Sequence, residues 1–266
     1  MSGFLRRLPQ ALVALAAAGV VTVGLLVGFS QGGPPVEPDR AVDATGRAAA
    51  SAITGAWPGT PVSTTPTSFL VADAARSTVD LFSAPDVPLA DGPTIDNPTW
   101  EGLPVVFLVL EDKGPWLHVR VSRRPNETTA WIKRDQVLLR RVPNRVVIEV
   151  GARRVTVYHG DTVLLQETVA VGSDRTPTPL GHFFVDGAVD VPYDTGPYGA
   201  FQVSVAGFSN VLQSFGGGVG QIAMHGTNRP ELLGQAVSNG CIRMTNDAIT
   251  KMVQLAPTGT PVTIVA

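Results

Sequence analysis

The chain of 266 residues has very little cysteine, since Cys241 is the only one. A single cysteine cannot form an intramolecular disulfide or build a cysteine-rich zinc site, so the sequence excludes both kinds of framework. Two interpretations of the thiol remain. It is either an inert side chain that packs like a small hydrophobe, or a reactive nucleophile.

Charged residues are also scarce, at 16% of the chain against about 25% in an average protein. The 20 Lys and Arg residues nearly balance the 22 Asp and Glu residues, which gives a net charge of −2. No run of basic residues follows the spacing of a phosphate backbone, so we predict that the chain has no nucleic-acid partner. The length is enough for about two domains.

A long apolar run stands near the N-terminus, where 19 uncharged residues extend from Ala11 to Phe29. A helix of about 20 apolar residues spans a bilayer, and the preceding Arg6 and Arg7 would stay in the cytoplasm. Because no convincing Ala-x-Ala site follows, we predict a signal anchor over residues 1–30, with a cleaved signal peptide as the alternative. The chain after the anchor is then extracytoplasmic. A lone thiol outside the membrane is at risk of oxidation, which favours deep burial or a chemical use.

Composition separates a spacer from a first β region. Residues 31–66 are rich in proline, alanine and glycine and are predicted to be a spacer. Residues 67–142 carry short alternating strands, including a run at 105–110 followed by a turn at 111–114, and predict a small antiparallel barrel. Within them the order PWLHVRV, RPNETTAWI and RDQVLL resembles bacterial SH3-like domains that accompany cell-wall enzymes.

Residues 144–266 again carry strand patterns, including the apolar run at 221–224. One helix is expected near the end, where Thr245 or Asn246 can act as N-cap. The predicted fold class is therefore mainly β, with one or two short helices in this last part.

His225 and Cys241 are the candidate catalytic pair of this last part. A thiol is a strong nucleophile only as thiolate, and a neighbouring imidazole can take its proton. Gly240 lets the backbone approach a substrate closely, so N–H groups near it are candidates to stabilise an oxyanion. The glycines at 216–218 lack the lysine of a phosphate-binding loop and are interpreted as a loop near the groove.

The segment HGTNRPELLGQAVSNGCIRM at residues 225–244 resembles the catalytic motif of the L,D-transpeptidase family. In that family a His-Gly-Thr segment precedes a Ser/Thr-x-Gly-Cys-x-Arg segment. Upstream, TPTPLGHFFV at residues 176–185 is similar to the Thr-Pro-x-Gly-x-Phe stretch of the same family. The resemblance extends over residues 145–266 and implies a β-sandwich catalytic domain.

The resemblance also implies roles for the motif residues. Cys241 would be the nucleophile and His225 its base, with the backbone carbonyl of Gly226 as the third member. The backbone N–H groups of Cys241 and Gly240 would form the oxyanion site. The predicted substrate-binding residues are Thr227, Ser238, Asn239, Arg243 and Tyr198.

Two of these substrate-binding residues have alternative interpretations, and a third departs from the family pattern. Arg243 matches the family arginine and would either hold a substrate carboxylate or brace the loop. Tyr198 lies in a turn before a strand and would either line the groove or pack. Asn239 departs from the family pattern, because many members have a histidine directly before the Gly-Cys pair.

The reaction implied by the resemblance is 3→3 cross-linking of bacterial peptidoglycan. Cys241 would attack the tetrapeptide stem, release D-Ala and form a thioester, which an amine of a second stem would then attack. No metal or organic cofactor is implied. The expected partners are peptidoglycan stem peptides, the membrane through residues 11–29, and carbapenems as covalent inhibitors, and the expected roles are cell wall organisation and cell shape. The alternatives are an L,D-carboxypeptidase, an enzyme that anchors proteins to the wall, and a catalytically silent wall-binding protein.

Overall fold

The computed structural model of the chain describes residues 65–191 and 196–266. The predicted anchor at residues 1–30 lies outside the described residues, as does the predicted spacer at 31–66 apart from its last two positions. No helix among the described residues is long and apolar enough to cross a membrane. The described part is mainly β with one α-helix, which confirms the predicted fold class at that level.

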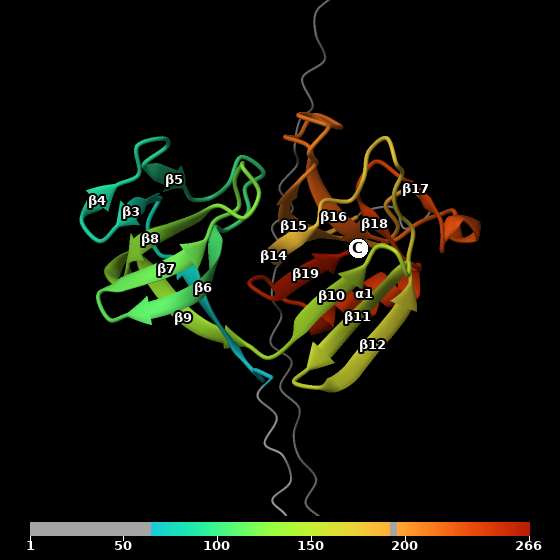
Figure 1. Ribbon diagram of the computed structural model, residues 1–266, viewed down its shortest axis with the longest axis horizontal. Helices are drawn as coiled ribbons and strands as arrows, with labels where there is room; N and C mark the ends of the chain where they lie inside the picture. The colour runs from blue at the N-terminus through green and yellow to red at the C-terminus, as the bar shows by residue number, and fades with distance from the viewer. Residues whose placement is uncertain (1–64, 192–195) are drawn as a thin grey trace, which may run out of the picture. The chain divides into compact units, whose positions relative to one another are not determined.

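The first β region forms a seven-stranded sheet in the order β4-β3-β8-β7-β6-β1-β9, with β2 and β5 paired beside it (Figure 1). In β7 and β8, buried residues alternate with half-buried ones, as expected for strands with one face on a core. The SH3-like character of this region remains a prediction. Its strands are β1 (Phe69–Ala74), β2 (Thr78–Asp80), β3 (Phe82–Ala84), β4 (Val87–Pro88), β5 (Thr94–Asp96), β6 (Val106–Lys113), β7 (Trp116–Arg120), β8 (Thr129–Lys133) and β9 (Val137–Val142), with the 3₁₀ turn η1 (Arg134–Gln136) before β9.

The turn predicted at residues 111–114 is wrong. Glu111, Asp112 and Lys113 belong to β6 and pair with β7, so the turn is confined to Gly114 and Pro115. Gly114 has a positive φ of 73° and donates its N–H to Asp112 Oδ1 at 3.0 Å. Three consecutive charged residues are typical of a loop, but they also occur at the solvent-exposed end of a strand, as here in β6.

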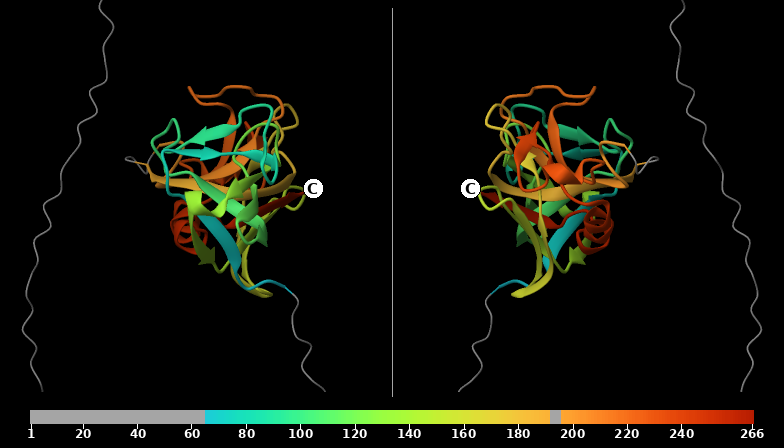
Figure 2. Two further views of the ribbon diagram at one scale, coloured as in Figure 1. Left: turned by 90° about the vertical axis from the view of Figure 1, so that its left-hand side faces the viewer. Right: turned by 90° about the vertical axis from the view of Figure 1, so that its right-hand side faces the viewer.

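The second β region forms an eight-stranded sheet in the order β12-β11-β10-β19-β14-β15-β16-β18, and β13 pairs with β17 beside it. The helix α1 contacts β12, β15 and β16 (Figures 1 and 2). Its elements are β10 (Arg145–Glu149), β11 (Arg154–His159), β12 (Thr162–Thr168), β13 (Val171–Gly172), β14 (Gly181–Asp190), β15 (Phe201–Phe208), β16 (Gln221–His225), η2 (Pro230–Leu232), β17 (Ala236–Ser238), β18 (Ile242–Arg243), α1 (Asn246–Leu255) and β19 (Pro261–Val265).

The helix begins where the capping signal predicted. The Thr245 hydroxyl accepts a hydrogen bond from the N–H of Ala248 at 3.1 Å, so Thr245 is the N-cap. Ala248, Ile249 and Met252 form the buried face of the helix. Because only Met244 separates Thr245 from the end of β18, the cap also fixes the chain just beyond Cys241.

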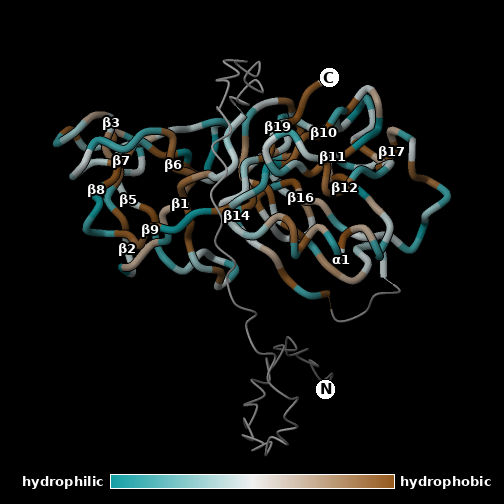
Figure 3. The backbone as a smooth tube through the Cα atoms, turned by 90° about the horizontal axis from the view of Figure 1, so that it is seen from below, coloured by the Kyte–Doolittle hydropathy of each residue, from teal (hydrophilic) through white to brown (hydrophobic). Residues whose placement is uncertain are grey.

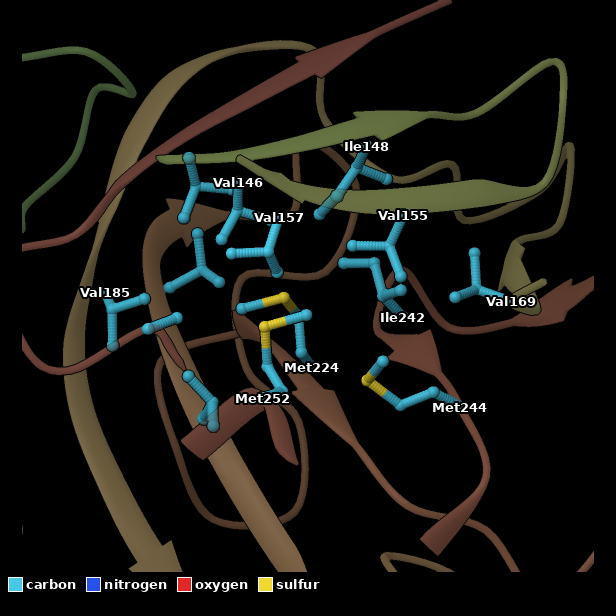
Figure 4. Close-up of a cluster of buried hydrophobic side chains, with 14 of the residues drawn as sticks. Val146, Ile148, Val155, Val157, Val169, Val185, Met224, Ile242, Met244 and Met252 are labelled. Carbon is cyan, nitrogen blue, oxygen red and sulfur yellow. The ribbon is translucent and has the colours of Figure 1, made fainter. Parts of the chain in front are cut away.

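The core of the second region is built from aliphatic side chains and methionines. Met224, Ile242, Met244 and Met252 meet the valines of β10 and β11 in one buried cluster (Figure 4). The hydropathy colouring in Figure 3 changes repeatedly along the strands, as expected for strands that bury one face. The cluster includes side chains of both β16 and β18, so it fixes the two strands that flank the candidate site.

The two sheets share a third hydrophobic cluster within one compact unit. Val71, Val106 and Leu108 of the first sheet are buried there with Phe184 and Ala206 of the second. The first β region is therefore packed against the second through buried side chains.

Candidate active site

The strands β16 and β18 bring His225 and Cys241 together. They pair in parallel, with Met224 opposite Ile242 and His225 opposite Arg243. Cys241 directly precedes β18, so it stands beside the last residues of β16. Both side chains line one hollow, so the fold brings the two predicted residues together.

The His225 ring is buried and its tautomer is fixed by the backbone. His225 Nδ1 lies 2.6 Å from the carbonyl oxygen of Gly226. Because a carbonyl only accepts hydrogen bonds, Nδ1 carries the hydrogen and Nε2 keeps a free lone pair. Burial, helped by the positive charge of Arg243, lowers the pKa of His225 to about 4, although the hydrogen bond to the Gly226 carbonyl acts in the other direction. The imidazole is thus neutral at neutral pH.

The Cys241 thiol is also neutral at rest. Burial raises its pKa above the ordinary thiol value, while the Ala223 backbone and the charge of Arg243 act weakly in the other direction. A neutral thiol beside a neutral imidazole makes a site in which the proton leaves sulfur as the nucleophile attacks.

The turn before Cys241 is held by Ser238. The Ser238 hydroxyl donates to the carbonyl of Cys241 at 2.6 Å and accepts from the N–H of Gly240 at 3.1 Å. Gly240 has a φ of 112°, which glycine tolerates best. Ser238 therefore braces the turn and also lines the hollow at Cys241, so its predicted substrate contact stays a prediction. Because the Ser238 hydroxyl already accepts a hydrogen bond from the N–H of Gly240, the N–H of Cys241 remains as the predicted oxyanion donor.

The upstream Thr-Pro motif supports the same turn. The Thr178 hydroxyl is buried, accepts from the N–H of Gly172 and donates to the carbonyl of Gly240, each at 2.9 Å. Thr176 donates its hydroxyl to the carbonyl of Ser238 at 3.1 Å. The motif is thus a brace for the nucleophile.

Gly226 lies in a tight crossing that also involves Thr227. A Cβ on Gly226 would lie 2.2 Å from Asn246 Oδ1, and one on Gly199 would lie 2.5 Å from the Gly226 Cα. Asn246 Oδ1 accepts from the N–H of Thr227, whose own hydroxyl accepts from the N–H of Arg229. Thr227 therefore has a role in the turn after His225, and its predicted substrate contact stays a prediction.

Two hollows meet at Cys241. One, of about 200 Å³, is lined by Tyr198, Asn239 and Arg243, which places these three predicted residues at the groove. Tyr198 is 38% exposed and its ring centroid lies 4.9 Å from that of His225, so the groove interpretation of Tyr198 is favoured over packing. Arg243 Nε is buried and has no hydrogen-bond partner among the described residues.

The other hollow has a volume of about 290 Å³, and the sequence predicted only part of its lining. Gly216 and Gly218 line it, as the predicted groove loop. Trp100 and Glu101 of the first β region also line it, and no sequence signal marks them, because only folding brings them within reach of Cys241. In the described part of the chain, no three His, Cys, Asp or Glu side chains gather in a way that could hold a metal ion.

Comparison with known proteins agrees with this geometry. Residues 143–264 match the family model of the YkuD type, the L,D-transpeptidase catalytic domain. The Bacillus subtilis protein named "Putative L,D-transpeptidase YkuD" is 34% identical over 123 residues, which are 46% of this chain and 66% of that protein. "Putative L,D-transpeptidase YqjB" of the same organism is 38% identical over 107 residues, 36% of this chain and 57% of that protein. This chain thus spans less than two thirds of the length of these curated relatives.

Solved structures of L,D-transpeptidases are more distant. The enzyme from Mycobacterium smegmatis is 18% identical with a TM-score of 0.37, covering 59% of this chain and 80% of that one. The enzyme from Enterococcus faecium is 17% identical with a TM-score of 0.36, covering 46% and 49%. The assignment rests on the sequence matches. Residues 143–264, which hold His225 and Cys241, are similar to the catalytic domain of the L,D-transpeptidases.

Proposed function

We propose that this chain is an L,D-transpeptidase that forms 3→3 cross-links in bacterial peptidoglycan through a thioester at Cys241. The observation that carries the proposal is the meeting of Cys241 with His225 in one hollow, where Gly226 holds His225 Nδ1 at 2.6 Å. The match of residues 143–264 to the catalytic domain supplies the reaction class.

In the first half-reaction Cys241 Sγ attacks the carbonyl at the L-centre of diaminopimelate in a tetrapeptide stem. The thiol proton passes to His225 Nε2, and the Cys241 N–H stabilises the oxyanion. The intermediate collapses, the amine of D-Ala leaves and takes the proton from His225, and a thioester remains. The Gly226 carbonyl accepts from Nδ1–H throughout and so stabilises the transient imidazolium.

In the second half-reaction an amine of a neighbouring stem attacks the thioester carbon. It gives its proton to His225, the sulfur leaves and the proton returns to it, so that the free enzyme is restored. The two hollows that Cys241 lines support separate approaches for donor and acceptor. Arg243 Nε is buried and has no hydrogen-bond partner in the described part of the chain, which supports a contact of this side chain with a substrate carboxylate.

The proposal extends to location and inhibition. The apolar segment 11–29 after Arg6 and Arg7 supports a single-pass anchor in the bacterial cell membrane, with the catalytic region on the extracytoplasmic side. Stem peptides are then the partners at the wall. Carbapenems, which present a strained carbonyl, are expected to acylate Cys241.

The test is incubation of the full chain with a disaccharide tetrapeptide, followed by mass spectrometry of the products. The proposal expects free D-Ala together with 3→3 dimers, and neither product from the Cys241→Ala variant. Tripeptide alone would indicate an L,D-carboxypeptidase, and stem peptide attached to a protein lysine would indicate an anchoring enzyme. A folded chain without turnover would leave a wall-binding protein and contradict the proposal.

A further inference from the structure

The hollow beside Cys241 adjoins a second one that leads to the interface of the two sheets. Trp100, Glu101 and Gln221 line both the hollow of about 290 Å³ at Cys241 and a neighbouring hollow of about 130 Å³. The neighbouring hollow is also lined by Asp186 of β14. The wall shared by the two hollows therefore connects the nucleophile with two carboxyl groups.

Asp186 is a buried carboxyl group that lacks part of its hydrogen bonding. Oδ2 accepts from Gln221 Nε2 at 2.7 Å and from the Ser122 hydroxyl. Oδ1 is buried and has no partner among the described residues. Burial raises the pKa of Asp186, while hydrogen bonds from Ser122, Gln221, Ser204 and its own backbone act in the other direction. A buried carboxyl oxygen without a donor costs free energy, and a cation placed nearby would lower that cost.

Glu101 adds a second carboxyl group and Trp100 an aromatic face. Burial and the negative charge of Asp186 both raise the pKa of Glu101, so the two groups oppose each other's ionisation. Trp100 is 67% exposed, and an exposed indole face attracts ammonium groups. No Lys or Arg is among the described residues that line these two hollows. Arg124 approaches this lining at the Val219 carbonyl, but its guanidinium is already engaged by three backbone carbonyls.

We infer that Glu101, Asp186 and Trp100 form a subsite for a primary ammonium group of the peptide substrate. The inference rests on the proposed function and assigns the first β region a part in substrate recognition. A stem peptide offers two sources of this group: the side-chain ammonium of the donor residue that Cys241 attacks, and the amine of the acceptor.

Binding to the full-length Cys241→Ala variant tests the subsite without turnover. The probes are a tetrapeptide with a free side-chain ammonium and the same peptide with that group acetylated, measured by calorimetry. We expect acetylation to weaken binding about tenfold, as for the loss of a charged hydrogen bond. Adding Glu101→Gln should remove most of this difference. Adding Glu111→Gln should keep it, because Glu111 is an exposed carboxylate on β6 paired with Lys113.

Asp186→Asn provides a second variant, used after thermal melting shows that it is folded, and is expected to act like Glu101→Gln. An undiminished preference for the free ammonium in both folded variants would overturn the inference, as would the absence of any preference in the parent.

Half-reactions of the active chain then separate the two sources. If the donor ammonium occupies the subsite, Glu101→Gln slows acylation by the free-amine donor and leaves the acetylated donor unaffected. If the acceptor occupies it, acylation is unchanged and attack by the amine on the acyl-enzyme slows. A failure of the proposed function looks different, because then no stem peptide acylates Cys241 although the binding preference persists.

Discussion

The catalytic pair consists of two side chains that are both uncharged at rest. Burial lowers the pKa of His225 to about 4 and raises that of the Cys241 thiol, so it disfavours a preformed thiolate–imidazolium pair from both sides. Proton transfer must then accompany attack. The Gly226 carbonyl determines which nitrogen of His225 receives the proton.

The lowered pKa of His225 gives a first prediction, on pH dependence. A lowered pKa means that the neutral, basic form persists as the pH falls, and is lost only near pH 4. The acid limb of the rate of Cys241 acylation by a carbapenem should therefore be centred at about 4, measured over the pH range in which circular dichroism shows a folded chain. His225→Gln should lower the rate by about 10²-fold or more. An acid limb near the ordinary histidine value would contradict the account.

A second prediction concerns the close crossing of Gly199 and Gly226. Gly199 has a φ of 63°, and a Cβ there would lie 2.1 Å from Asn246 Oδ1. Gly114 is the matched control, because it has a φ of 73° but nothing within 4 Å of its Cβ position. Alanine at Gly114 should lower the free energy of unfolding by about 1 kcal/mol from backbone strain alone.

Alanine at Gly199 should lower the free energy of unfolding by about 3 kcal/mol, since overpacking adds to the strain. It should also slow acylation, because the displaced Gly226 peptide orients His225. Urea denaturation and acylation rates of the two variants decide the matter. Equal losses of stability with an unchanged acylation rate would show that the crossing does not orient the site.

At the scale of elements, the segment between β15 and β16 is tied to the first β region mainly by Arg124, and Asn126 adds a hydrogen bond to Asn210 Oδ1 at 3.3 Å. Arg124 donates to the carbonyls of Ser209, Leu212 and Val219 at 2.9 to 3.1 Å. This segment carries Gly216 and Gly218 of the groove wall. The first β region thus shapes the groove through this segment as well as through Trp100 and Glu101.

Removal of this tie is the third prediction. Arg124→Ala should lower the free energy of unfolding by about 2 kcal/mol, as expected for hydrogen bonds from a charged group. Amide exchange in residues 209–220 should accelerate, and acylation by a stem peptide should slow. Arg123→Ala is the control, because Arg123 bonds to the carbonyls of Asp91 and Gly92 within its own region. Unchanged exchange in Arg124→Ala would contradict the role of the tie.

The elements also show how far the sequence was informative. β16 and the N-cap at Thr245 could be predicted, because a buried apolar run and a capping residue act locally. The strands β17 and β18 have only three and two residues, which is too short to show a period, yet β18 sets Cys241 beside His225.

The side chains of the site divide in the same way. Cys241 and His225 could be predicted from their motif, whereas the bracing roles of Ser238 and Thr227 depend on which backbone groups the fold leaves unpaired. Glu101 and Trp100 depend on packing of the two sheets and have no local signal.

At the scale of the molecule, the two sheets share a buried cluster around Phe184. Arg140 of β9 adds a polar link to the second region by donating to the Thr258 carbonyl at 2.9 Å, and Asp73 of its own sheet holds its guanidinium in an ion pair at 2.7 Å. A shared core couples the unfolding of the parts that contribute to it. The groove, with walls from both sheets, is expected to last only while the two stay docked.

The fourth prediction is that both sheets unfold in one cooperative transition and that Phe184→Ala lowers its free energy by about 3 kcal/mol. Scanning calorimetry of the full chain, together with amide exchange resolved by region, measures this. Two separate transitions, with only the second sheet affected by Phe184→Ala, would show that the sheets fold independently.

The most direct test of the central claim is the mass of the intact full chain after incubation with a carbapenem. The account predicts a single adduct of one inhibitor, located on Cys241 by peptide mapping and absent from folded Cys241→Ala. A folded wild-type chain that gains no mass, or a Cys241→Ala variant that gains the same adduct, would contradict a nucleophilic Cys241.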